Sequence, residues 1–213
     1  MIDVNQLIIQ IPVFLLALSG HEAAHAWAAN KLGDPTARRM GRVTLNPLAH
    51  IDPIGTVLFP LTLILLKIPP IGWAKPVMVN PYNLRRPRQD NLWISLAGPG
   101  ANIGFAVFFA LLFRVMAMGG LNGNRFWLEP VLYFLIMSVQ INLLLAFFNL
   151  IPIPPLDGSG IVLGLLPSEY VRYYEQLRPF GFIIVYALLW MGLFDKVLLP
   201  LVDGLYAILL GGS

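Results

Sequence analysis

Residues 7–29 read LIIQIPVFLLALSGHEAAHAWAA, an apolar stretch that carries two histidines and a glutamate near its end. A helix needs about 20 mostly apolar residues to cross a bilayer, and this stretch is long enough. A cleaved signal peptide has a basic region ahead of its apolar segment, whereas the N-terminus here offers only Asp3 as a charged side chain. We therefore expect residues 7–29 to stay in the protein as a transmembrane helix.

The composition of the whole chain also indicates a membrane protein. Of its 213 residues, 57% are hydrophobic and 12% are charged, which is about half the charged fraction of an average soluble domain. This balance argues against a soluble globular domain, a disordered chain and a collagen-like repeat. Further apolar stretches cover residues 92–118, 128–150, 179–193 and 197–210, of which the last two are short. The predicted class is an all-α polytopic membrane protein, a single domain with about five to six transmembrane helices.

The charge and the absence of cysteine narrow the function further. The net charge is +3 at pH 7 and the basic residues lie between apolar runs, which favours a membrane surface over nucleic acid as the partner. The chain contains no cysteine. This excludes disulfides, thiolate zinc sites, iron–sulfur clusters and cysteine nucleophiles.

A shorter apolar segment, residues 54–67, decides the topology. It contains Pro60 and lies between two basic loops. Loops rich in Lys and Arg stay in the cytoplasm, and a single crossing between these two would place them on opposite sides. We favour a small re-entrant or interfacial hairpin near residues 36–80, with a true span as the open alternative. The N-terminus is then outside, the C-terminus inside, and the chain crosses five times. The basic residues are Lys31, Arg38, Arg39 and Arg42 before the segment and Lys75, Arg85, Arg86 and Arg88 after it.

The first apolar stretch contains the sequence His21-Glu22-Ala-Ala-His25. Residues i and i+4 of a helix share one face, so His21 and His25 can bind one metal ion while Glu22 lies where it can accept a proton from water. In a soluble helix such a pattern can also be a solvated face. In an apolar span each ionisable residue costs at least about 2.5 kcal/mol. Three of them together therefore indicate a functional zinc site.

A catalytic zinc ion typically has three protein ligands, so a third ligand is needed. Residues 149–158 read NLIPIPPLDG, and their three prolines break the preceding helix in a way that can return Asp157 to the first helix. The alternative is that Asp157 only caps a helix that begins near Ser159. His50 is a less favoured ligand because loop histidines more often lie on the surface.

Three motifs together resemble the site-2 protease family of intramembrane zinc metalloproteases. They are the His21-Glu22-x-x-His25 sequence, residues 95–102 (SLAGPGAN) and residues 149–158. They occur in that family's order, and the resemblance covers roughly residues 15–165, followed by C-terminal helices at about 176–211. It indicates a short member of bacterial type, for which we expect neither a PDZ nor a CBS domain.

The resemblance implies roles for individual residues. It implies one zinc ion held by His21, His25 and Asp157, with Glu22 as the general base. It further implies that Asn149 lines the active site and assists substrate or oxyanion binding.

A second stretch of the resemblance, residues 72–77 (GWAKPV), implies strands that dip into the membrane. Such a segment can pair with an extended substrate through its backbone, which makes Trp73, Lys75 and Val77 candidate substrate-binding residues. The alternative is a surface turn rich in Pro and Gly.

Other polar and small residues of the predicted spans allow weaker predictions. Asn102 is a candidate substrate-binding residue, but the adjacent Gly100-x-x-x-Gly104 pattern first predicts a close helix-packing face. Gln140 and Asn142 are expected to form hydrogen bonds between helices.

The sequence therefore predicts a zinc-dependent metalloendopeptidase in the cell membrane. Its substrates are membrane-anchored proteins or peptides, cut within or near their transmembrane segments, at an active site nearer the cytoplasmic side. The alternative is a membrane metal transporter that uses the same cluster. Glu22 discriminates between the two, because a hydrolase needs it as a base and a carrier would bind metal through it.

Overall fold

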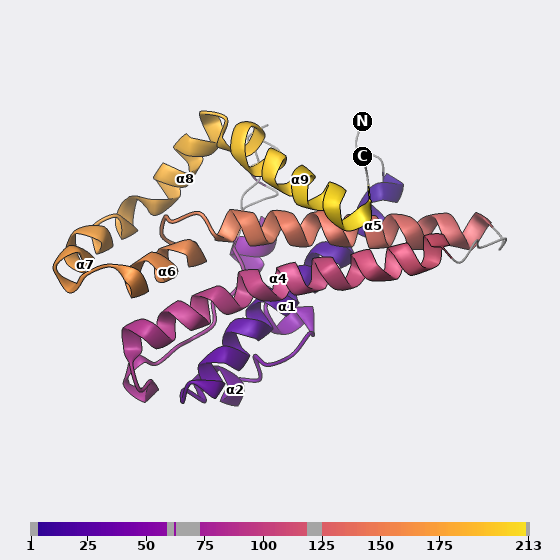
Figure 1. Cartoon of the computed structure of the whole chain (residues 1–213). Helices are drawn as coiled ribbons and strands as arrows, with labels where there is room; N and C mark the ends of the chain where they lie inside the picture. The colour runs from indigo at the N-terminus through magenta and orange to yellow at the C-terminus, as the bar shows by residue number, and fades with distance from the viewer. Residues whose placement is uncertain (1–3, 59–61, 63–72, 119–124, 212–213) are drawn as a thin grey trace.

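Every regular element of the described residues, which are 4–58, 62, 73–118 and 125–211, is helical in the computed structural model of the chain (Figure 1). The predicted all-α class is confirmed. No strand occurs among these residues, so the strand expected near residues 72–77 is absent from the described part of that segment. The helices are α1 (Val4–Lys31), α2 (Thr36–Arg39), α4 (Pro87–Met118), α5 (Arg125–Asn149), α6 (Asp157–Leu165), α7 (Ser168–Glu175), α8 (Gly181–Trp190) and α9 (Leu199–Leu210).

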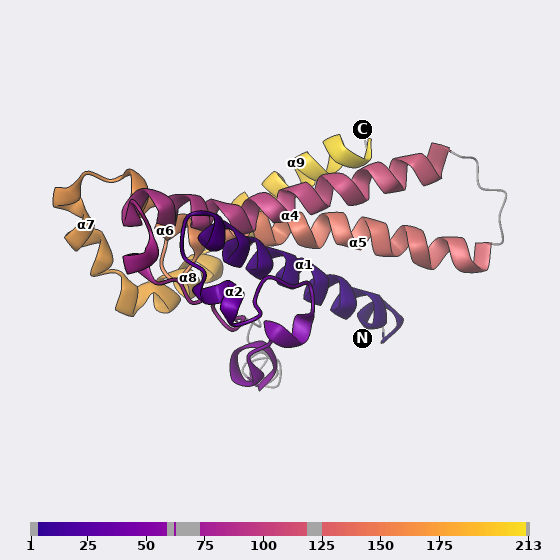
Figure 2. The same ribbon diagram turned by 90° about the horizontal axis from the view of Figure 1, so that it is seen from below.

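Three long helices form the centre of the molecule. Figure 2 shows α1, α4 and α5 side by side, with α4 antiparallel to the other two, and α9 lies along α4 and α5. α5 packs along α4, and the ring of Phe109 on α4 meets that of Phe134 on α5 edge to face at 6.0 Å. The buried core of this bundle comprises Ala106, Phe109, Ala110, Leu135, Val139, Leu143 and Val202.

The prediction that Gly100 and Gly104 form a helix-packing face is wrong. Both residues are exposed, and a Cβ atom at either position would meet nothing within 4 Å. The inward face of α4 instead carries Gly98, Asn102 and Ala106, all buried and four residues apart. Successive helix positions are 100° apart, so Gly100, two residues after Gly98, lies nearly on the opposite side of the helix.

Among the described residues, two helices are long and apolar enough to cross a membrane, namely α4 and the part of α5 from Leu128 to Asn149, and the span expected over residues 7–29 is not among them. The C-terminal helices pass the same test only as a bent pair, Ser168–Trp190 with Phe194–Leu210, which meet at 69°. The described residues therefore give two candidate spans, or three if this pair is one broken span, and the predicted five to six are not confirmed. The break follows from Gly192, whose φ of +93° ends α8.

The two ends of the segment predicted as a hairpin lie together. The backbone N–H of Trp73 donates to the carbonyl of Gly55 at 3.1 Å, and the hydroxyl of Thr56 donates to the carbonyl of Trp73 at 2.8 Å. The chain thus enters and leaves this region at one place, as a hairpin requires. Of residues 54–67 themselves, only 54–58 and 62 belong to the described residues.

Candidate active site

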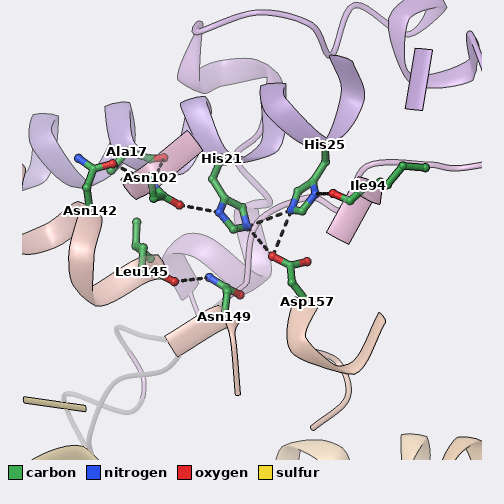
Figure 3. A network of polar contacts seen from close by, with 9 residues as sticks. All are labelled: Ala17, His21, His25, Ile94, Asn102, Asn142, Leu145, Asn149 and Asp157. Carbon is green, nitrogen blue, oxygen red and sulfur yellow. Dashed lines mark hydrogen bonds and ion pairs between the residues drawn. The ribbon is translucent and has the colours of Figure 1, made fainter. Parts of the chain in front are cut away.

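Three side-chain atoms converge between α1 and the start of α6 (Figure 3). His21 and His25 lie on successive turns of α1, with their Nε2 atoms 3.1 Å apart. The Oδ2 atom of Asp157 lies 3.0 Å from Nε2 of His21 and 3.2 Å from Nε2 of His25. Asp157 is the first residue of α6, and Leu156 occupies the capping position. The alternative in which Asp157 only caps a helix near Ser159 is therefore wrong.

A fixed amide sets the tautomer of His21. The side-chain nitrogen of Asn102 donates to the carbonyl of Ala17 at 3.1 Å and to Oδ1 of Asn142 at 2.8 Å. The side-chain oxygen of Asn102 therefore faces Nδ1 of His21, at a distance of 2.6 Å. Because that oxygen can only accept, the imidazole carries its hydrogen on Nδ1 and presents a lone pair at Nε2.

A backbone carbonyl sets the tautomer of His25 in the same way. Nδ1 of His25 lies 2.7 Å from the carbonyl oxygen of Ile94 on α4. Carbonyl oxygens also only accept, so this ring too presents a lone pair at Nε2. Metal-ligating histidines commonly donate their second ring N–H to such a carbonyl or side-chain oxygen.

The converging atoms fit a zinc ion. Two imidazole lone pairs and a carboxylate oxygen face one another with no hydrogen between them, and the buried Oδ2 atom of Asp157 has no hydrogen-bond partner. Three acceptors at such short range repel one another unless a cation lies among them. Two nitrogens and one oxygen are a ligand set that zinc uses in catalytic sites. Within the described part of the chain, His21, His25 and Asp157 are the group that can hold a metal ion.

The three ligand residues line a cavity of about 470 Å³. Glu22 and Asn149 line the same cavity, and the Asn149 side-chain nitrogen donates to the carbonyl of Leu145 at 2.9 Å. One wall is the segment of residues 73–80, here called the wall segment, which contributes Trp73 and Val77. The remaining lining residues are Leu18, Ala74, Pro76, Val79, Asn91, Ile94, Ser95, Leu145, Pro155, Leu156 and Phe182.

Three residues that the sequence suggested for the site lie elsewhere. Asn102 is 0% exposed and lies behind His21 rather than on the cavity wall, so it contacts the ligand and not a substrate. Lys75 is exposed, and its only hydrogen bond to the described residues runs from its backbone N–H to the carbonyl of His50 at 2.8 Å. His50 is itself 0% exposed, with Nε2 2.9 Å from the carbonyl of Thr44, so the expectation of a surface histidine is wrong. The hydrogen bond from Lys75 holds that part of the chain over His50.

The sequence did not single out several residues that the structure brings to the site. Asn91, Ser95 and Phe182 line the cavity, and Phe182 contacts Trp73 with ring centroids 5.9 Å apart. Asn91, Ser95 and Gly98 lie on one face of α4. Their spacing in the sequence is the signal that could have identified this face as part of the site. The predicted hydrogen bond between helices is confirmed for Asn142, whereas Gln140 forms none with the described residues.

Comparisons with known proteins agree with this geometry. The profile of Peptidase family M50 matches residues 115–192. The chain is 35% identical over 189 residues to YwhC of Bacillus subtilis, covering 89% of this chain and 83% of that protein, whose name assigns it to the zinc metalloproteases. It is 32% identical over 186 residues to Rip2 of Mycolicibacterium smegmatis, named in the same way, covering 87% of this chain and 68% of that protein. No solved structure matches the chain.

Proposed function

We propose, from the premise that this chain belongs to peptidase family M50, the site-2 protease family, that it hydrolyses peptide bonds within or near transmembrane segments of membrane-anchored substrates. The chain is a zinc metalloprotease and an integral membrane protein. The observation that carries the proposal is the cavity in which the three ligand residues and Glu22 meet. That cavity is also lined by residues of α4 and α5, the two candidate spans, so a substrate within the membrane has access to the same helices.

The cavity residues divide the chemistry among them. Zinc, when bound by His21, His25 and Asp157, acts as a Lewis acid that polarises the scissile carbonyl and makes water a better nucleophile near neutral pH. Glu22 accepts the proton of the attacking water and passes it to the leaving amine. Asn149 uses one of its two amide hydrogens on Leu145. The second remains to stabilise the oxyanion that develops on the carbonyl.

The wall segment provides a place for an extended substrate. The backbones of Val77, Met78 and Val79 form no hydrogen bond with any described residue, although Val77 and Val79 line the cavity. A transmembrane helix must unwind before its carbonyls can be attacked, and its freed N–H and C=O groups then need partners. We infer that these three residues pair with the unwound substrate by backbone hydrogen bonds.

The proposed membrane arrangement has the N-terminus outside and the active site nearer the cytoplasmic face. Arg114, near the end of α4, donates to the carbonyl of Ile208 of α9 at 2.7 Å, so the end of α9 lies at the far end of α4 from the site, which does not support the cytoplasmic C-terminus expected from five crossings. Asn91, Ile94 and Ser95 lie in the first three turns of α4, directly after the exposed basic residues Arg85, Arg86 and Arg88. This places the cavity near the basic end of the span, and basic loops are cytoplasmic. The joined ends of the segment around residues 55–73 support the re-entrant hairpin.

The transporter alternative is distinguished by Glu22. A metal carrier would recruit this carboxylate as a ligand, whereas here it lines the cavity outside the convergent group. That position suits a general base, which has to reach water rather than the ion.

Elemental mass spectrometry of the purified protein tests these assignments. We expect about one zinc ion per chain in the wild type and in Glu22→Gln, because that glutamate is not a ligand, and little zinc in Asp157→Ala, because a ligand is lost. Glu22→Gln should also lose cleavage of a single-pass reporter in the same vesicles, and mass spectrometry of the wild-type products should place the cut within the membrane segment. Loss of zinc from Glu22→Gln together with its retention in Asp157→Ala would favour the carrier instead.

A further inference from the structure

The wall segment is fastened at both of its ends but not in its middle. At its start, the N–H of Lys75 donates to the carbonyl of His50 at 2.8 Å, and Trp73 is bonded to Gly55 and Thr56. At its end, the N–H of Asn80 donates to Oδ2 of Asp34 at 2.7 Å. The unpaired stretch that faces the cavity thus depends on two anchor points for its position.

Asp34 is the anchor that joins this segment to the helix of the zinc ligands. It follows the end of α1, is 0% exposed, and binds donors from both sides of the junction. Its own turn supplies Thr36, whose N–H lies 3.1 Å from Oδ1. The distant loop supplies Asn80 and the side-chain nitrogen of Asn83, which lies 2.8 Å from Oδ1.

Asp34 accepts these bonds as a carboxylate. Burial by itself raises its pKa, but hydrogen bonds from the side chains of Asn83 and Thr36 and from the backbones of Asn80 and Thr36 outweigh burial and hold the pKa below its ordinary value. Hydrogen bonds to an ionised acceptor are about twice as strong as neutral ones. The junction is therefore stronger than its number of bonds suggests.

The packing around Asp34 leaves this junction little freedom. Gly33 has a φ of +114°, and a Cβ atom there would lie 2.9 Å from the carbonyl oxygen of Asn83. Directly beneath, Ala28, Ala29, Leu84 and Ile94 form a small buried core against which Val79 packs. Val79 is both part of this core and part of the cavity wall, so a shift at Asp34 moves the wall.

We propose that Asp34 is a positioning residue for the substrate: by holding Asn80 it sets the distance between the free backbone of residues 77–79 and the zinc ligands on α1. This inference rests on the proposed function, because it assumes that a peptide lies between the two. Under this proposal, different residues of one site bind the metal and position the substrate. His21, His25 and Asp157 hold the metal, while Asp34, which contacts none of them, determines where the substrate lies.

Asp34→Asn tests the proposal, since it keeps the size of the side chain and removes the charge and one acceptor. We expect KM for a membrane-anchored reporter to rise about tenfold, the effect of losing one hydrogen bond to a charged group, with kcat and zinc content nearly unchanged. Asp195→Asn is the matched control, because Asp195 is exposed and has no hydrogen bond to the described residues.

A second readout does not depend on cleavage. The chain has no cysteine, so Val79→Cys reports the position of the wall segment through its rate of thiol labelling. We expect Asp34→Asn to accelerate that labelling about tenfold by freeing a segment held by charge-assisted bonds. Ser138→Cys, at a residue of α5 that is 0% exposed, should stay unlabelled in both backgrounds.

The outcomes separate this proposal from the proposed function. Any one of three results with Asp34→Asn would overturn the positioning role of Asp34. They are unchanged labelling of Val79→Cys, an unchanged KM, and labelling of Ser138→Cys together with zinc loss. A wild type that cuts no membrane reporter contradicts the proposed function instead, and the labelling experiment still decides whether Asp34 holds the wall segment.

Discussion

At the scale of single residues, one helix controls both histidine ligands. The acceptors of the two Nδ1 hydrogens, Asn102 and the carbonyl of Ile94, belong to α4, whereas His21 and His25 belong to α1. The approach of α4 to α1 therefore decides both the tautomers and the ring orientations. A metal site built in this way is sensitive to residues that never contact the ion.

Replacing Asn102 by alanine should weaken zinc binding while leaving all three ligands in place. The variant removes the acceptor for His21 Nδ1, and loss of such a partner commonly reduces metal affinity about 10- to 100-fold. Competition with a chelator of known affinity measures this change. Asn30→Ala is the control, because the Asn30 side chain forms no hydrogen bond with the described residues, and an equal loss in both variants would refute the role given to Asn102.

At the scale of elements, α4 and α6 reach the site because glycines let them approach closely. A Cβ atom at Gly160 of α6 would lie 2.1 Å from the Ser95 hydroxyl of α4, and one at Gly158 would lie 2.4 Å from the carbonyl oxygen of Leu150. Side chains at these two positions would push α6 away from its neighbours. Asp157, at the first position of the same helix, would then lose its place beside the histidines.

Gly98 and Gly100 of α4 provide a matched pair for testing this packing. An alanine Cβ at Gly98 would lie 2.3 Å from His25 Nε2, and both imidazoles are held by their Nδ1 bonds and cannot easily give way. We expect Gly98→Ala to lower zinc affinity at least about tenfold, comparable with the loss of an outer-shell partner.

Gly100→Ala should leave zinc binding intact and stabilise the fold. Its Cβ atom meets nothing within 4 Å, so zinc content should be unchanged and the free energy of unfolding should rise by about 0.5–1 kcal/mol because alanine favours a helix. Zinc titration and denaturant unfolding in detergent measure the two quantities. Similar zinc affinities in both variants would show that the close contact at Gly98 is unimportant.

At the scale of the whole molecule, local patterns were predictable and long-range partners were not. The helical spacing of His21 and His25 was enough to place both on one face, and hydropathy was enough to identify α4 and α5. The role of Asp157 came from the family resemblance, because nothing in the spacing connects residue 157 to residue 21.

The inward face of α4 was predicted wrongly, since a Gly-x-x-x-Gly pattern does not reveal which side the neighbouring helix occupies. The two C-terminal spans are not confirmed, because Gly192 ends α8 and the two short helices pass as a span only as a bent pair.

The topology is the last property that belongs to the whole chain. Asp34 joins the loop after α1 to the loop before α4, and Gly55 is bonded to Trp73, so both basic loops lie at one end of the bundle. A single crossing between them would separate its ends by about 30 Å. We therefore expect cysteines placed at the exposed residues Arg39 and Arg86 to react with an impermeant thiol reagent from the same, cytoplasmic, side.

Oriented vesicles allow this to be measured against an internal control. Figure 2 shows the start of α5 at the far end of the bundle from the start of α4. A cysteine at Glu129, which is exposed near the start of α5, should therefore react from the opposite side. Labelling of Arg39→Cys and Arg86→Cys from opposite sides would mean that the intervening segment crosses once. The hydrogen bonds of Asp34 and of Gly55 could then not exist in the membrane, and the positioning role of Asp34 would fail together with the re-entrant hairpin.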